Sequence, residues 1–145
     1  MGKLTEQNLP KIETKTPEVS FKYLYNMKRC LSYVHKESNK KTTNYFDKIQ
    51  EFINRYSTFN NINEANDYFC PRKGKKISSG NNKYIRKLLK ELKKNYPEVD
   101  GKFVDDELDH YHLKPKGKGV EVVFGFTYSN VLYIVDFDLY HEFNN

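Results

Sequence analysis

The spacing of apolar residues changes near Gly101, and this change limits what the chain can fold into. Upstream, apolar residues recur every three or four positions over 45–56 and again over 82–96, as on one face of an α-helix. Downstream they alternate along 120–126 and run together along 131–137, as in β-strands. Helices followed by strands favour an α+β domain. We therefore expect an antiparallel sheet packed by two to three helices.

Local signals give the expected ends of the helices. Asn61 followed by Glu64 resembles a capping box, which predicts a short helix that continues to Phe69. Pro97 cannot continue a helix and should end the one over 82–96. The polar stretch from Ser38 to Thr43 carries candidate caps for the helix over 45–56, and Cys70-Pro71 should end the short helix.

The remaining strands are predicted from alternation and turn residues. Residues 110–113 fit a short strand, and Ser129-Asn130 predicts a tight turn between the two C-terminal strands. Near the start, alternation over 19–25 and a second apolar run over 30–34 predict a strand or a hairpin. The polar stretch 1–17 contains two prolines and predicts a flexible lead-in to a single domain over 18–145.

The composition favours a folded protein that stays in solution. Twelve tyrosines and ten phenylalanines can bury large areas, although hydrophobic residues make up only 37% of the 145 residues. Cys30 and Cys70 form no Cys-x-x-Cys pair, which indicates two free thiols in a reducing cytosol. No apolar run reaches 18 residues and no signal sequence is present, so we expect a cytoplasmic protein without a membrane partner.

Positive charge is concentrated in residues 72–94. This segment holds ten basic residues and one acid, Glu91, whereas the whole chain has a net charge of +6. The rest of the chain is therefore slightly acidic. The ten basic residues are Arg72, Lys73, Lys75, Lys76, Lys83, Arg86, Lys87, Lys90, Lys93 and Lys94. A field concentrated in one segment predicts a polyanionic partner, and nucleic acid is the first candidate.

Projected onto a helix, residues 82–96 separate into an apolar face and a basic face that spans about 120°. Like charges lie four residues apart on the basic face, and a bound phosphate backbone would relieve their repulsion. Lysine favours backbone contact over base recognition. Basic loops at 72–82 and 114–118 extend this surface. The candidate nucleic-acid-binding residues are Arg72, Lys73, Lys75, Lys76, Lys83, Arg86, Lys87, Lys90, Lys94, Lys114, Lys116 and Lys118.

Histidines are the candidate catalytic residues. His110 and His112 have strand spacing and would point the same way, and His141 lies near the C-terminus. No spacing of His, Cys or acidic residues matches a metal site, so we expect neither a metal nor a cofactor. RNA cleavage through the 2′-hydroxyl needs only a general base, a general acid and cations at the phosphate. Histidine suits either proton-transfer role, and the lysines at 114–118 would hold the phosphate.

The C-terminal third resembles the end of the RelE/ParE-superfamily toxins over residues 108–143. It contains a His112-Leu113-Lys114 element, a strand, a tight hairpin, an apolar strand, and a terminal His141 followed by Phe143. The resemblance implies a RelE-like fold and a catalytic His141, with His110 as an upstream active-site residue. One departure is that strand 120–126 carries Glu121 and no arginine, where those toxins place a catalytic one.

These observations lead to two main hypotheses, beside a third in which the protein is a protein–protein module whose basic helix pairs with an acidic antitoxin-like partner. The first is a toxin-like endoribonuclease from a bacterium or phage, which binds RNA in preference to DNA and has an acidic antitoxin as a possible partner. The second is a non-catalytic phage or mobile-element protein. It would inhibit a host defence complex by binding its nucleic acid or an acidic protein surface.

Overall fold

The structure, a computed structural model, describes residues 16–40, 44–69, 76–78, 82–101, 107–114 and 119–139. The described helices are α2 (Met27–Lys40), α3 (Tyr45–Tyr56), α4 (Ile62–Phe69), α5 (Lys83–Asn95) and the 3₁₀ helix η1 (Pro97–Gly101). The described strands are β1 (Glu18–Ser20), β2 (Lys76–Ser78), β3 (Glu107–His112), β4 (Val122–Tyr128) and β5 (Val131–Asp138). The predicted lead-in 1–17 lies outside these residues except for Thr16 and Pro17.

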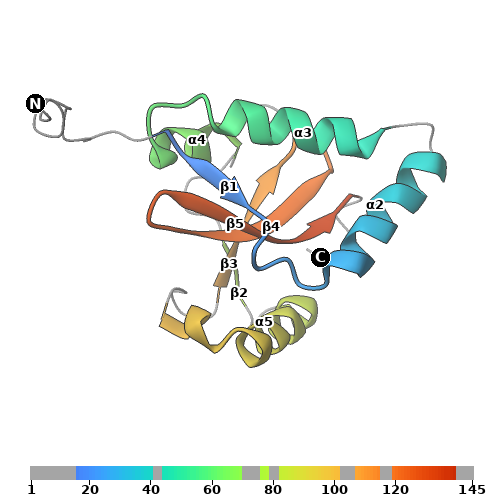
Figure 1. The fold of residues 1–145 in the computed structure, drawn as a ribbon, viewed down its shortest axis with the longest axis vertical. Helices are drawn as coiled ribbons and strands as arrows, with labels where there is room; N and C mark the ends of the chain where they lie inside the picture. Colours follow the sequence, from blue (N-terminus) through green and yellow to red (C-terminus); the bar gives the residue numbers. More distant parts are fainter. Residues whose placement is uncertain are drawn as a thin grey trace, which may run out of the picture.

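The strands form one sheet in the order β1-β5-β4-β3-β2 (Figure 1). The α+β class is confirmed. The expectation of a purely antiparallel sheet is wrong at one edge, because β1 runs parallel to β5 while the other pairs are antiparallel. Four α-helices, rather than two or three, occur in the described part of the chain. None of these described helices is long and apolar enough to cross a membrane.

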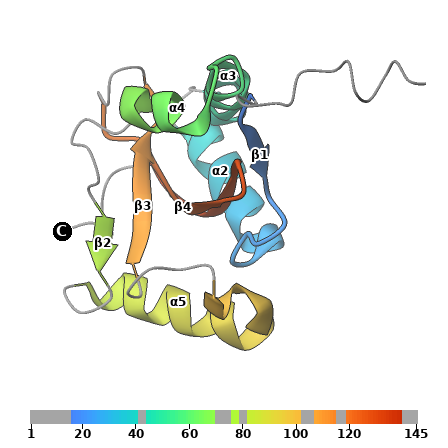
Figure 2. The same ribbon diagram turned by 90° about the vertical axis from the view of Figure 1, so that its left-hand side faces the viewer.

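Helices cover both faces of the sheet (Figure 2). One apolar cluster packs the sheet against α2, α3 and α4 and includes Val34, Phe52 and Phe69. A second cluster packs the opposite face against α5 and includes Leu88 and Phe124. Because both faces are covered, every residue from Val122 to Phe126 is buried, although the sequence shows alternation there.

Three predicted helices are confirmed as α3, α4 and α5. An asparagine precedes each one, and its side chain accepts a hydrogen bond from the backbone N–H three residues later. These asparagines are Asn44, Asn61 and Asn82. Such caps satisfy donors that the first turn leaves open, so the polar residues between the apolar runs set where each helix begins.

The predicted N-terminal hairpin is wrong. Only Glu18–Ser20 form a strand, and residues 27–40 form α2. The buried residues of α2 are Cys30, Val34 and Glu37, which have helical spacing. That spacing is obscured in the sequence because Met27 and Leu31 are apolar yet exposed, and because the buried Glu37 looks like a surface residue. The predicted loop 72–82 also contains a strand, β2, which pairs with β3.

The β4–β5 hairpin carries two local features. Ser129 and Asn130 have positive φ angles of 52° and 69°, which confirms the predicted tight turn. Further along, Phe124 pairs with Asp136 while Gly125 pairs with Ile134, so β5 contains one extra residue. This β-bulge places Asp136 beside Phe124, whose side chain belongs to the α5 cluster.

Candidate nucleic-acid interface

Helix α5 is held on the sheet by one strongly apolar face. Ile85, Leu88, Leu89 and Leu92 are each at most 3% exposed and pack against strands β3, β4 and β5. The helix begins after Asn82, which is itself buried and caps the first turn. The orientation of α5 about its own axis is therefore fixed, and the direction in which its basic residues point follows from it.

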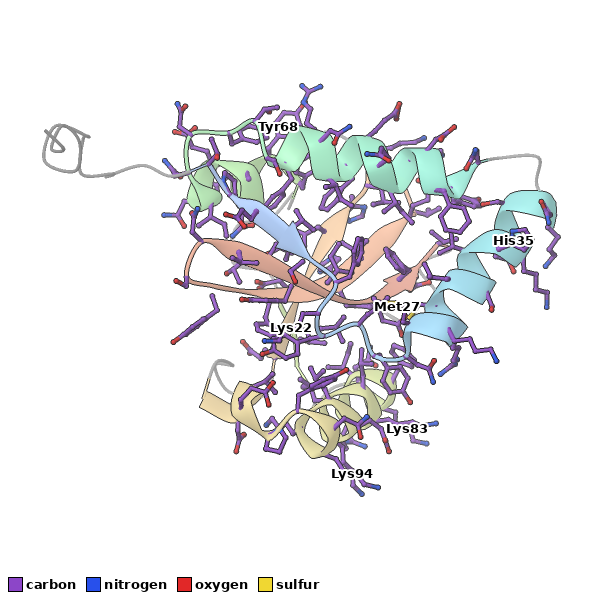
Figure 3. The ribbon with its side chains drawn as sticks, viewed as in Figure 1. Lys22, Met27, His35, Tyr68, Lys83 and Lys94 are labelled. Atoms are coloured by element: carbon purple, nitrogen blue, oxygen red, sulfur yellow. The ribbon has the colours of Figure 1, made fainter. Side chains whose placement is uncertain are left out.

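Five basic side chains project from the opposite side of α5 into solvent, and we call this surface the α5 basic face. It consists of Lys83, Arg86, Lys87, Lys90 and Lys94. Figure 3 shows Lys83 and Lys94 pointing away from the sheet. Within the part of the chain that the structure describes, none of these five side chains forms an ion pair. The charge of this face is therefore available to a partner.

Lys93 is the sixth basic residue of α5 and differs from the other five. It is half-buried, and its Nζ lies 3.6 Å from Asp100 Oδ1 in η1. Lys93 therefore helps to join α5 to η1, and we exclude it from the binding face.

The other predicted binding residues are only partly covered by the structure. Lys114 is exposed just after β3, and the backbone of Lys76 belongs to β2. Arg72, Lys73, Lys75, Lys116 and Lys118 lie outside the described residues. The structure thus brings together the five residues of α5.

The structure buries the two central histidines. His110 is 4% exposed and His112 is 8% exposed, and their ring centroids are 5.5 Å apart. His112 donates a hydrogen bond from Nδ1 to the carbonyl oxygen of Gly119 at 3.0 Å. Neither ring offers an open surface to an RNA phosphate in this conformation. His141 lies outside the described residues.

A buried polar cluster that the sequence did not indicate links α2, α5 and β5. Asp136 Oδ1 accepts hydrogen bonds from the Cys30 thiol at 3.1 Å and from the backbone N–H of Phe137 at 2.8 Å. Its other oxygen, Oδ2, accepts a hydrogen bond from the Tyr84 hydroxyl. A small cavity of about 60 Å³ adjoins the cluster and is also lined by Arg29 and Tyr33.

Burial dominates the electrostatics of this cluster. It raises the pKa of Asp136 from 3.8 to about 6, although the hydrogen bonds from Cys30 and Phe137 and the charge of Arg29 act in the opposite direction. Burial also raises the pKa of the Cys30 thiol, and the adjacent Asp136 carboxylate raises it further. The cluster therefore keeps Cys30 protonated and makes Asp136 sensitive to mild acid.

A pocket of about 170 Å³ lies between the start of α2 and the start of α5. It is lined by Tyr25, Arg29, Tyr84, Lys87 and Leu88. Lys87 belongs to the α5 basic face, so the pocket opens beside it. Sequence reasoning missed this pocket because Tyr25 and Tyr84 are distant along the chain and no motif connects them.

Within the described ranges, no three His, Cys, Asp or Glu side chains gather as ligands for a metal ion. No protein-family model matches the chain, and comparison with curated proteins and with solved structures gives no significant match.

Proposed function

We propose that this protein binds nucleic acid through the α5 basic face. The observation that supports this proposal is the clustering of five exposed basic side chains on one rigidly packed helix, without an ion pair among the described residues. Phosphates that bind such a face release condensed counterions, which favours association. The self-repulsion of the like charges would fall at the same time.

The residue types indicate contact with the nucleic-acid backbone. Four of the five residues are lysines, which act as point charges and lack the planar fork with which arginine recognises guanine. The interface would therefore bind many sequences with similar affinity.

Burial of His110 and His112 favours binding without cleavage. A general acid or base must come within hydrogen-bond reach of the reacting group, and neither ring is accessible to a large polyanion. An RNA-cleavage assay with wild-type protein and His141→Ala tests this part of the proposal. Cleavage products that disappear in the His141→Ala variant would restore the toxin-like ribonuclease hypothesis.

A salt titration of binding tests the interface itself. Five phosphate contacts predict a slope of log Kobs against log salt of about −4.5 for duplex DNA and about −3.5 for a single strand. The double variant Lys90→Gln/Lys94→Gln removes two contacts and should reduce the size of these slopes by about 1.8 and 1.4. The measurement is fluorescence anisotropy with a labelled oligonucleotide between 50 and 200 mM salt.

A matched control removes the same charge elsewhere. Lys36 and Arg55 are exposed on α2 and α3, so Lys36→Gln/Arg55→Gln should leave the slope close to that of the wild type. Absence of salt-dependent binding by the wild type, or equal losses in the two double variants, would contradict the proposal. In that case binding to an acidic protein becomes the next hypothesis.

A further inference from the structure

The pocket between α2 and α5 has a lining that suits one nucleotide. Two tyrosine rings, from Tyr25 and Tyr84, supply flat aromatic surface, and both residues are half-buried. Arg29 and Lys87 are exposed cations in the lining, and the buried Leu88 supplies an apolar surface. None of these lining residues is acidic. The lining therefore combines a surface for stacking with charges that attract phosphate.

The size of the pocket limits what it can hold. A volume of about 170 Å³ is below the range of roughly 300–1,000 Å³ typical of pockets for drug-sized ligands. One flat ring fits this space better than a dinucleotide does. A base that is paired and stacked inside a duplex cannot enter it without leaving the helix.

Contacts with neighbouring residues restrain the tyrosines and the arginine that line the pocket. The Tyr84 hydroxyl donates a hydrogen bond to Asp136, and this contact restrains the orientation of the Tyr84 ring. The backbone N–H of Tyr25 donates to the carbonyl oxygen of Val135 at 2.7 Å, at the β-bulge of β5. The guanidinium of Arg29 lies 5.8 Å from the centre of the Tyr25 ring. The pocket is thus positioned before a ligand arrives, which lowers the entropic cost of binding.

We propose that this pocket binds one unpaired nucleotide of a single strand, with the base against Tyr25 and Tyr84 and the phosphate at Arg29 and Lys87. This inference rests on the proposed function, because Lys87 belongs both to the pocket and to the α5 basic face. The strand would run from the basic face to the pocket. Single-stranded RNA and DNA share the required chemistry, whereas an intact duplex lacks an accessible base.

The test compares three labelled 12-mers of one sequence: single-stranded RNA, single-stranded DNA and duplex DNA. Tyr25→Ala should weaken binding to both single strands about fivefold or more, which is the lower limit for loss of one stacking contact. Arg29→Gln should weaken the same two complexes. Duplex affinity should change less than twofold in either variant. The RNA and DNA arms show which strand the pocket prefers.

Two control substitutions match the test variants. Arg55 also lies over a tyrosine ring, that of Tyr68, at 5.1 Å, but on α3 across the sheet from α5. Arg55→Gln should bind all three probes as the wild type does. Tyr128 is a 48% exposed tyrosine at the end of β4, so Tyr128→Ala is the control for loss of an aromatic ring. If Tyr25→Ala unfolds, Tyr25→Leu and Arg29→Gln still test the pocket.

The outcomes separate this inference from the proposed function. Wild-type binding that is unchanged by Tyr25→Ala, Tyr25→Leu and Arg29→Gln, or that is stronger for the duplex, would overturn the pocket while the α5 basic face stands. Failure of the wild type to bind any probe would overturn both. Selective loss of single-strand binding in the pocket variants, with Lys90→Gln/Lys94→Gln weakening all three probes, would support both.

Discussion

The thiol of Cys30 donates a hydrogen bond to the carboxylate of Asp136, with 3.1 Å between Sγ and Oδ1. These residues are 106 positions apart in the chain, and their contact joins α2 to β5. Tyr84 of α5 donates a hydrogen bond from its hydroxyl to the same carboxylate. The two helices that line the proposed pocket, α2 and α5, therefore meet β5 at one buried ionisable group, and the protonation of this group is linked to the stability of the fold.

Asp136→Asn should remove a pH dependence of stability. Burial raises the pKa of Asp136 from 3.8 to about 6, so between these values the folded protein holds a proton that the unfolded chain has released. The contribution of Asp136 therefore makes folding less favourable as pH rises from about 4 to 6, by up to about 3 kcal/mol, and it is constant above that range. Urea unfolding from pH 4 to 7 should show this difference between the wild type and Asp136→Asn.

Glu51→Gln is the control for this experiment because Glu51 is an exposed carboxylate on α3. Its unfolding free energy should follow the wild-type pH profile. If the unfolding free energy of Asp136→Asn changes with pH in the same way as that of the wild type, the pKa of Asp136 is the same in the folded and unfolded chains. The proposed link between Asp136 and stability would then be wrong.

The Cys30 thiol should be unreactive in the folded protein. Burial and the adjacent Asp136 raise its pKa, so little thiolate forms near neutral pH, and the side chain is only 2% exposed. In a Cys70→Ser background, a disulfide reagent at pH 8 should modify Cys30 in guanidinium but not under native conditions. Rapid modification of the native protein would mean that the contact between α2 and β5 opens readily.

Ser129→Asn should stabilise the protein. Ser129 has a φ of 52° at the first turn position between β4 and β5, a conformation that asparagine tolerates better than serine does. We expect an increase of about 0.5 kcal/mol in the free energy of unfolding, measured in urea. Ser129→Val should instead lower the free energy of unfolding, because a β-branched side chain is strained at positive φ. An unstable Ser129→Asn variant would contradict this account of the turn.

The elements with one dominant local signal were predictable from the sequence. The apolar spacing in 45–56 and 82–96 was enough to predict α3 and α5. The Ser129-Asn130 pair likewise fixed the hairpin turn. These signals lie within a few residues of the structures they specify, so no tertiary contact was needed to interpret them.

The features that depend on distant contacts were not predictable. Glu37 is buried in α2, and its 6% exposure cannot be inferred from a polar stretch of sequence. The bulge that brings Asp136 beside Phe124 depends on the pairing of β4 with β5. The candidate site divides in the same way: the α5 basic face follows from helical periodicity, whereas the pocket needs the tertiary contact between the start of α2 and the start of α5.

Gly125→Ala should be strongly destabilising because β4 and β5 approach closely at the bulge. A Cβ atom at Gly125 would lie 2.4 Å from the carbonyl oxygen of Tyr133 and 3.1 Å from Leu132 Cδ1. The first of these neighbours is backbone, so relief requires a shift of the strand, and we expect a loss of about 3 kcal/mol or more in the free energy of unfolding. Gly101→Ala is the matched control, since a Cβ there meets nothing within 4 Å and should change stability by less than about 0.5 kcal/mol. Equal stabilities of the two variants would show that the strands do not approach as closely as the bulge requires.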